Sequence, residues 1–281
     1  MYAQLARRGF FWTVGLGAIA VLFSKLGGGT TRTQDAGPGG AASGKFPAVK
    51  AIGFDTFGTV VDWRGSLAEE SAAWGKTKGI RNVDWFRFAD RWRDHYRPNM
   101  DKVRKGEFPW KTVDEMNRMA LDEVLREFGI TRITEEEKDR WNLAWHRLKP
   151  WPDSVPGLAR LKKKYLISPC SNGDVGLLTR LSKHSGLPWD WIFGADLAKH
   201  YKPDPEVYLT VVHLLSLKPE EFMMAAAHTY DLDAARKLGL RTGFIYRPNE
   251  YDSVDKADKA KPGDYDVVCN SITELASQLG T

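Results

Sequence analysis

Polar side chains that could do chemistry follow four of the strands that the sequence predicts. They supply carboxylates, hydroxyls, an amide, an ammonium and an imidazole, and they are Asp55, Thr59, Ser171, Asn172, Lys202, His228 and Asp231. Because the carboxyl ends of parallel strands meet at one edge of a sheet, we expect these groups to line a shared ligand crevice. Two carboxylates beside an ammonium suit nucleophilic displacement and the activation of water.

Each of these segments also has a purely structural interpretation. Ser-Asn-Gly at 171–173 is a common turn, and Lys-Pro-Asp at 202–204 commonly leads into a helix. An Asp that opens a helix often caps it. The occurrence of all four segments at successive strand ends favours a shared site over four independent turns.

Asp55 ends the first predicted strand, the apolar run at 49–54, and residues 56–59 are predicted to form a turn. Gly58 can take a backbone conformation that other residues resist. An ordinary Asp titrates near about 4, so the Asp55 carboxyl is expected to be ionised at neutral pH.

The remainder of the chain from residue 151 alternates between strand and helix patterns. The predicted strands are 165–168 (ended by Pro169), 191–193, 222–226, 241–245 and 265–268, and the predicted helices are 154–164, 175–185, 204–215 and 232–238. Such alternation predicts an α/β fold with a parallel sheet and helices on both faces.

Residues 66–150 interrupt this alternation with helical patterns at 67–74, 85–96, 112–128 and 135–148. An insert of this length after the first strand predicts a helical cap subdomain. The predicted core is then residues 45–65 together with 151–281.

Residues 1–44 have the order of an export signal and a linker. Arg7 and Arg8 resemble a twin-arginine signal, and the apolar run at 9–23 is short for a membrane span of about 20 residues. We expect an exported, periplasmic protein. Retention of residues 9–23 as a membrane anchor is one alternative, and a mitochondrial-type presequence or a mis-called start is another. Small residues at 40–42 could accept a signal peptidase.

Composition excludes several classes of protein. Of the formal charge of +5, residues 1–44 contribute +3, so the remainder has 37 basic and 35 acidic residues. This balance, without a basic stripe, argues against a nucleic-acid partner. Cys170 and Cys269 lack metal-type spacing and are expected to be free, buried thiols.

Four segments in order carry a resemblance to a known family. They are Phe-Asp-Thr-Phe-Gly-Thr at 54–59, Ser-Asn-Gly at 171–173, Tyr-Lys-Pro-Asp at 201–204 with Tyr208, and Tyr-Asp at 230–231 leading into Ala-Ala-Arg-Lys-Leu-Gly at 234–239. Residues 49–281 resemble the haloacid dehalogenase (HAD) superfamily, and within it the L-2-haloacid dehalogenase (type II) branch. The resemblance implies a HAD-like, Rossmann-like parallel sheet core with an inserted α-helical cap. It also implies a homodimer through the cap helices and no cofactor.

The resemblance further implies how such an enzyme acts on an (S)-2-halo acid. Asp55 attacks C2, expels the halide and forms an ester, while Lys202 and Thr59 hold its carboxylate. Asp231 orients or deprotonates the water that hydrolyses the ester to an (R)-2-hydroxy acid, and Tyr208 belongs to the surrounding network. No metal takes part.

Substrate contacts follow from the same resemblance. Ser171 binds the substrate carboxylate, and Asn172 helps to hold the leaving halide. The cap supplies an arginine to the halide, for which Arg93 in Trp-Arg at 92–93 is the best match. Phe57 and Phe108 are expected to form pocket walls.

The last motif departs from a well-known form of the type II pattern. Ala226 and His228 stand where that form has Ser and Asn. Because His228 can share a proton and histidine titrates near neutrality, we expect water activation and pH dependence to differ here.

Two alternatives remain open. A magnesium phosphatase of the same superfamily generally has a second Asp where Phe57 stands and another where Ala227 stands, and a hard dication needs several oxygen ligands. An exported, non-catalytic binding protein is the other alternative. It would have no need of Asp55, Lys202 and Asp231 together.

Overall fold

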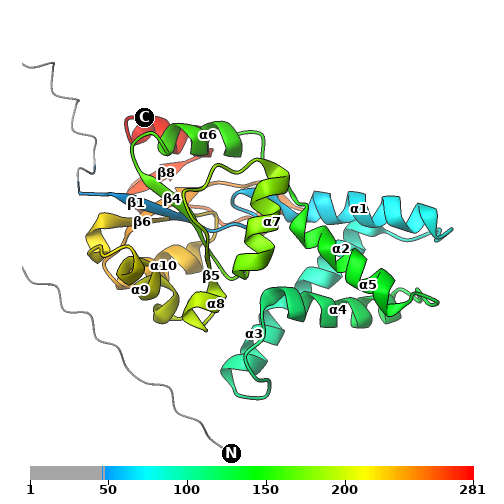
Figure 1. The fold of residues 1–281 in the computed structure, drawn as a ribbon. Coiled ribbons are helices and arrows are strands. Elements are labelled where there is room, and N and C mark those ends of the chain that lie inside the picture. The colour runs from blue at the N-terminus through cyan, green and yellow to red at the C-terminus, as the bar shows by residue number, and fades with distance from the viewer. Residues whose placement is uncertain (1–45, 47) are drawn as a thin grey trace, which may run out of the picture. The chain divides into compact units, whose positions relative to one another are not determined.

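The computed structural model describes Phe46 and residues 48–281, which belong to one compact unit (Figure 1). The predicted export signal and linker, residues 1–44, lie outside the described residues. Within the described part of the chain, no helix is both long enough and apolar enough to cross a membrane.

The described residues form a parallel sheet of six strands in the order β5-β4-β1-β6-β7-β8. These strands are β1 (Ala51–Phe54), β4 (Leu166–Ser171), β5 (Phe193–Gly194), β6 (Phe222–Ala226), β7 (Arg241–Ile245) and β8 (Val267–Cys269). The predicted α/β fold with a parallel sheet is confirmed. β1 lies inside the sheet between β4 and β6, so the residue that follows it is central.

Helices cover both faces of this sheet (Figure 1). One face packs against α6 (Ser154–Leu161), α7 (Val175–Ser185) and α11 (Ile272–Gln278), and the other against α9 (Pro205–Leu214) and α10 (Thr229–Lys237). In β1, Ile52 and Phe54 belong to the first core cluster and Ala51 to the second. This period of two is what a strand buried on both faces requires.

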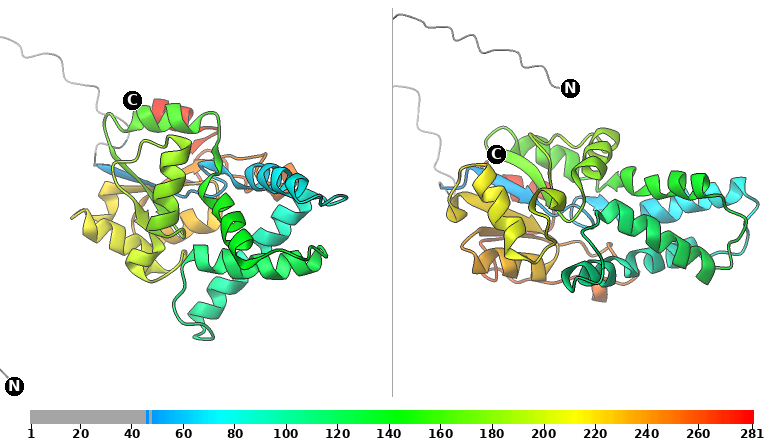
Figure 2. Two further views of the ribbon diagram at one scale, coloured as in Figure 1. Left: turned by 45° about the vertical axis from the view of Figure 1, so that its right-hand side comes forward. Right: turned by 60° about the horizontal axis from the view of Figure 1, so that its bottom comes forward.

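A helical segment, residues 63–146, lies at one end of the sheet (Figures 1 and 2). It comprises α1 (Trp63–Thr77), α2 (Trp85–Asp94), α3 (Tyr96–Arg104), α4 (Val113–Glu127), α5 (Glu135–Asn142) and the 3₁₀ turn η1 (Leu143–His146). The chain enters and leaves it through β2 (Val61–Asp62) and β3 (Lys149–Pro150), which pair antiparallel. This short ribbon anchors both ends of the segment to the sheet domain.

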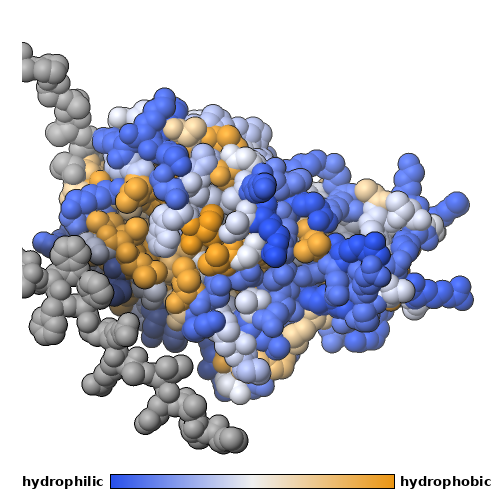
Figure 3. All heavy atoms as spheres, viewed as in Figure 1, coloured by the Kyte–Doolittle hydropathy of each residue, from blue (hydrophilic) through white to orange (hydrophobic). Residues whose placement is uncertain are grey.

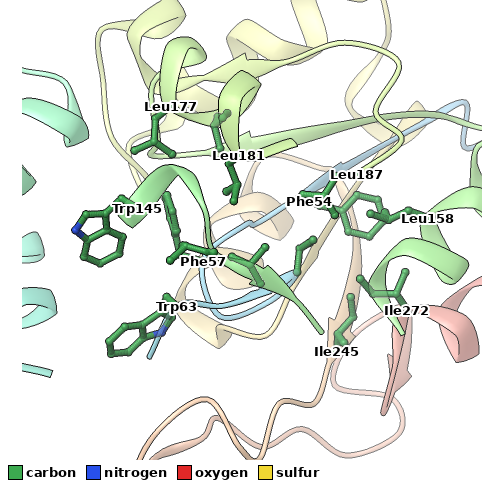
Figure 4. Packing of buried hydrophobic residues seen from close by; sticks show 14 of the residues in the cluster. Phe54, Phe57, Trp63, Trp145, Leu158, Leu177, Leu181, Leu187, Ile245 and Ile272 are labelled. Carbon is green, nitrogen blue, oxygen red and sulfur yellow. The ribbon is translucent and has the colours of Figure 1, made fainter. Parts of the chain in front are cut away.

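Aromatic rings hold the helical segment together from inside. Trp141 stacks on Trp74 and Phe88, with ring centroids 4.1 and 5.0 Å apart. Nearer the sheet, Phe57 and Trp145 meet edge to face at 5.9 Å and lie beside Trp63 (Figure 4). The same aromatic core therefore runs from the helical segment to the turn after β1.

The face of the helical segment that is seen in Figure 3 is mostly polar. Arg118, for example, pairs with Asp122, Glu135 and Asp139. In the same view, apolar residues gather over the side of the sheet where α8 (Ala195–Ala198) and α9 lie.

Pro169 does not break the strand as predicted, because β4 continues through it to Ser171. Backbone N–H groups alternate along a strand, and that of Ile167 points away from β1, to the Asp190 carboxylate. The nitrogen of Pro169 therefore points to the same side, where β5 begins to pair only at Cys170. Proline has no backbone N–H, but no hydrogen bond between strands is lost at this position.

Several helix predictions also need correction. The helix predicted at 85–96 ends at Asp94, and α3 follows with Pro98 in its first turn, where a missing N–H is tolerated. The helix predicted at 135–148 ends at Asn142 and continues as η1. The small helix α8 and the helix α11 were not predicted, although the Ser271 hydroxyl accepts a hydrogen bond from the Glu274 N–H at 3.0 Å and marks the start of α11.

Candidate active site

Strand β1 delivers Asp55 to the carboxyl edge of the sheet. The Asp55 N–H donates to the Ala225 carbonyl of β6 at 2.9 Å, and the residue is 6% exposed. The chain then turns sharply, with both Val60 and Val61 donating to the Thr56 carbonyl. Gly58 takes a φ of +89°, which only glycine adopts without strain.

Three side chains donate to the Asp55 carboxylate. Lys202 Nζ lies 2.8 Å from Oδ1, and the Thr59 hydroxyl lies 2.8 Å from Oδ2. His228 Nδ1 lies 3.0 Å from the same Oδ2. The structure therefore brings three predicted groups together around Asp55, and two of them, Lys202 and His228, come from distant parts of the chain.

Lys202 joins Asp55 to the second carboxylate of the site. Its Nζ lies 2.5 Å from Asp231 Oδ2, and its own backbone N–H donates to Asn172 Oδ1 at 2.7 Å. The Tyr208 hydroxyl donates to the other oxygen of Asp231, at 2.5 Å. Both oxygens of Asp231 are thus engaged, and the residue is fully buried.

Glu250 is a site residue that the sequence analysis missed. Its carboxylate oxygens both lie 3.1 Å from His228 Nε2, and the Trp63 indole N–H donates to it at 3.1 Å. A Cβ on Gly58 would come within 2.0 Å of Glu250 Oε1, so glycine also makes room for this carboxylate. Glu250 follows β7, and a charged residue after another parallel strand is the signal that could have identified it.

The pKa values of the site follow from these alternating charges. Burial raises the pKa of Asp55, but the neighbouring Lys202 and His228 outweigh it and hold that pKa below its usual value. Burial lowers the pKa of His228, yet Glu250 and Asp55 raise it to about 10. Lys202 likewise has a raised pKa, because Asp231 and Asp55 outweigh its burial. At neutral pH, Asp55 is an anion between two cations.

Asp231 behaves differently from Asp55. Burial raises its pKa, and the nearby charge of Asp55 adds to this effect, while Lys202 opposes both. Asp55 and Asp231 therefore share the Lys202 ammonium, and Asp231 has the higher proton affinity of the two carboxylates.

A cavity of about 220 Å³ opens beside His228. It is lined by Arg93, Asp94, Tyr96 and Arg97 from the helical segment and by His228, Tyr230 and Tyr251 from the sheet domain. We call it the site cavity. Typical pockets for drug-sized ligands hold roughly 300–1,000 Å³, so this one suits a small molecule.

Arg93 reaches the site cavity through an aromatic surround. Its guanidinium carbon lies 3.8 Å from the Tyr96 ring centroid and 5.5 Å from those of Phe57 and Trp63. Its Nη1 is buried and has no hydrogen-bond partner among the described residues. A buried cationic donor without a partner is suited to binding an anion.

The remaining predicted residues lie in two places. Ser171 is buried, and its hydroxyl accepts a hydrogen bond from the Gly173 N–H at 3.2 Å. It directly precedes Asn172, whose side chain contacts Lys202, so Ser171 lies close to Lys202. Phe108 does not line the site cavity. It follows α3, where its N–H donates to the Lys102 carbonyl and its ring lies 5.2 Å from Lys102 Nζ. Tyr96 lines the cavity, although the sequence analysis did not name it.

The residues present do not fit a divalent metal ion. Among the described residues, no group of three or more His, Cys, Asp or Glu side chains is arranged to hold one. All four carboxylate oxygens of Asp55 and Asp231 already accept hydrogen bonds from protein side chains, with Lys202 Nζ between the two groups.

Comparison with known sequences identifies relatives across most of the chain. A family model for haloacid dehalogenase-like hydrolases matches residues 49–239. (S)-2-haloacid dehalogenase 4A of Burkholderia cepacia is 28% identical over 211 residues, which cover 73% of this chain and 87% of that protein. (S)-2-haloacid dehalogenase 1 of Pseudomonas sp. (strain CBS-3) is 27% identical over 224 residues, covering 72% and 88%.

Solved structures agree with this result. The crystal structure of a defluorinating L-2-haloacid dehalogenase is 47% identical, with a TM-score of 0.80 over 83% of this chain and 96% of that chain. The structure of a second L-2-haloacid dehalogenase is 44% identical, with a TM-score of 0.77 over 82% and 99%. The family and fold predicted from the sequence are confirmed, and the chain belongs to the haloacid dehalogenase-like hydrolases.

Proposed function

We propose that the chain hydrolyses short (S)-2-halo carboxylic acids to (R)-2-hydroxy acids through an ester on Asp55, without a metal ion. The observation that carries the proposal is a buried Asp55 anion whose partner His228 lines a small cavity. Arg93, which has an unpartnered donor, lines the same cavity. The relatives named as (S)-2-haloacid and L-2-haloacid dehalogenases support the same reaction.

In the first step, one Asp55 oxygen attacks C2 from the side opposite the halogen. A C–O bond forms, the C–X bond breaks, and the halide leaves with the bonding electron pair, so C2 inverts. Lys202 and Thr59 hold the carboxylate in place, as their distances of 2.8 Å allow. No base is required, because Asp55 is already an anion.

Arg93 receives the departing halide in this scheme. Its buried Nη1 supplies the donor, and the rings of Tyr96 and Phe57 exclude water from its faces. An anion gains more from a donor in such a dry surround than in open water. Ser171 and Asn172 remain the proposed contacts for the substrate carboxylate and the halide.

In the second step, water attacks Cγ of the ester. We assign the base to His228 rather than to Asp231, because both Asp231 oxygens already accept hydrogen bonds. Esterification removes the charge of Asp55, which is one of the two anions that raise the pKa of His228. Nδ1 can then lose its proton to solvent and face the ester oxygen with a free lone pair.

The proton balance then closes. One water proton moves to His228, the other ends on the product hydroxyl, and Asp55 regains its charge as the ester C–O bond breaks. Glu250 orients the His228 ring through Nε2 and stabilises the imidazolium that forms. One proton and one halide ion leave for each molecule hydrolysed.

The test is halide release from (S)-2-chloropropanoate and from its fluoro analogue by wild type and by Asp55→Asn, with EDTA present. The fluoro acid is included because one relative is named as defluorinating. We expect release in EDTA by wild type and none above background in the variant. Absence of release, together with magnesium-dependent hydrolysis of a phosphate ester, would reject the proposal.

A further inference from the structure

Two residues that line the site cavity form a contact between the helical segment and the sheet domain. Arg97 lies in the first turn of α3, and Tyr230 lies in the first turn of α10. The Arg97 guanidinium carbon lies 4.3 Å from the Tyr230 ring centroid. Arg97 is exposed and Tyr230 is half-buried, so this pair lies between the cavity and solvent.

The charges at this opening favour an anion. Arg93 and Arg97 both line the cavity, and neither forms an ion pair with any described residue. Asp94, which also lines the cavity, is paired with Arg91 at 2.7 Å. A guanidinium stacked on a ring keeps its N–H edges free, and these edges match a carboxylate in geometry.

The size of the cavity limits what can pass this opening. The cavity offers about 220 Å³ and is lined by Arg97 and Tyr230, so an alkyl chain that outgrows this volume meets these two side chains. The Tyr230 ring also packs against His228, with centroids 5.8 Å apart, so its displacement would disturb the inner wall.

We propose that Arg97 and Tyr230 form an entrance gate that attracts short carboxylate anions and excludes acids with longer chains. The inference rests on the proposed function, because it names which 2-halo acids reach Asp55. It makes Arg97 and Tyr230 specificity residues, separate from the groups that contact the reacting atoms.

Steady-state kinetics with (S)-2-chloropropanoate and 2-chlorohexanoate test the gate in Arg97→Ala, Tyr230→Leu and Tyr230→Phe. Arg87→Ala is the matched control, since Arg87 also lies over a ring, that of Phe128 at 5.8 Å, but outside the cavity. It removes the same charge from an exposed side chain of the same helical segment.

For Arg97→Ala we expect KM for 2-chloropropanoate to rise about fivefold with kcat within about twofold, the effect of one exposed ion pair. The ratio of kcat/KM for the long acid to that for the short acid rises in Arg97→Ala and Tyr230→Leu. It stays at the wild-type value in Tyr230→Phe, which keeps the ring, and in Arg87→Ala. A ratio unchanged in both gate variants, or a loss confined to kcat, overturns the inference.

A binding measurement separates failure of the gate from failure of the proposed function. If wild type releases no halide from either acid, the function fails, and tryptophan fluorescence then follows the binding of propanoate and hexanoate. A larger loss of binding for propanoate than for hexanoate in Arg97→Ala, relative to wild type, supports the gate. Equal binding of each acid by the two proteins overturns it.

Discussion

At the scale of the residue, ionised side chains alternate in sign across the site. The order from one end to the other is Asp231, Lys202, Asp55, His228 and Glu250. Buried ions are tolerated only when each is paired, and removal of one leaves its neighbours uncompensated. The proposed reaction would make use of this coupling, because esterification neutralises the central anion and thereby changes the proton affinity of His228.

Replacement of His228 by Gln tests the assignment of the base. We expect the ester to form and then persist, because hydrolysis loses its base and slows by about 100-fold or more. Rapid-quench measurements should show one halide ion released per chain, and the mass of the intact chain should include the acyl adduct. His184→Gln, an exposed substitution of the same kind, should turn over normally. Steady halide release without an acyl adduct would instead assign the role of the base to Asp231.

The raised pKa of His228 also predicts how stability depends on pH. A histidine with a pKa of about 10 in the folded state and about 6.5 unfolded contributes stability that is full below pH 6.5. This contribution is lost as the pH rises through about 10. Thermal melts between pH 6.5 and 10.5 should therefore fall more steeply in wild type than in His228→Gln. Parallel curves would contradict a charged His228.

At the scale of the element, the turn after β1 sets the geometry of the site. It places Thr59 beside Asp55 and leaves space at Gly58 for the Glu250 carboxylate. The Thr59 hydroxyl also accepts from the Ala227 N–H at 2.8 Å, which fixes the turn to the segment after β6. Asp55 and His228 are thus held by one connected set of backbone and side-chain hydrogen bonds.

Gly58→Ala should damage both stability and activity. A non-glycine residue at a φ of +89° costs about 1–3 kcal/mol, and its Cβ would collide with Glu250. Gly79→Ala is a matched control, since Gly79 has a φ of +67° with nothing within 4 Å of its Cβ position. Urea unfolding should show both variants destabilised, whereas halide release should fall only in Gly58→Ala. Equal activity in the two variants would separate Glu250 from catalysis.

Periodicity and turn chemistry were sufficient to predict the elements nearest the site. The predicted strands at 222–226 and 241–245 match β6 and β7 at both ends. Errors arose where tertiary context decides the outcome. Pro169 lies in a strand because no partner strand needs a backbone N–H there, and a single residue separates the end of α2 from the start of α3. Glu250 is assigned to the site only by its contacts, since its loop contains none of the family motifs.

At the scale of the whole molecule, the sheet collects groups that are nearly two hundred residues apart in the chain. Asp55 follows β1, His228 follows β6 and Glu250 follows β7, while the helical segment adds Arg93 from the end of α2. The order of the parallel strands, β1-β6-β7, places these three strand ends side by side. Neither the sheet nor the helical segment lines the site cavity alone.

We also propose that residues 1–44 export the protein through their paired arginines. In a bacterium with a twin-arginine pathway, the wild-type chain should be found in the periplasm, because Arg7 and Arg8 precede an apolar run. Cell fractionation of the double variant Arg7→Lys and Arg8→Lys should find it in the cytoplasm. The same distribution for both chains would contradict the proposal, and a membrane-bound fraction would favour an anchor at residues 9–23.

The central claim, an ester on Asp55, is tested most directly by turnover of (S)-2-chloropropanoate in water enriched in oxygen-18. Because water attacks Cγ, each turnover leaves one solvent oxygen in the Asp55 carboxylate and passes an Asp55 oxygen to the product. We therefore predict that mass spectrometry finds the label in the peptide that contains Asp55 after several turnovers. Label in the hydroxy acid from the first turnover, with none in that peptide, would contradict the account and show that water attacks C2 directly.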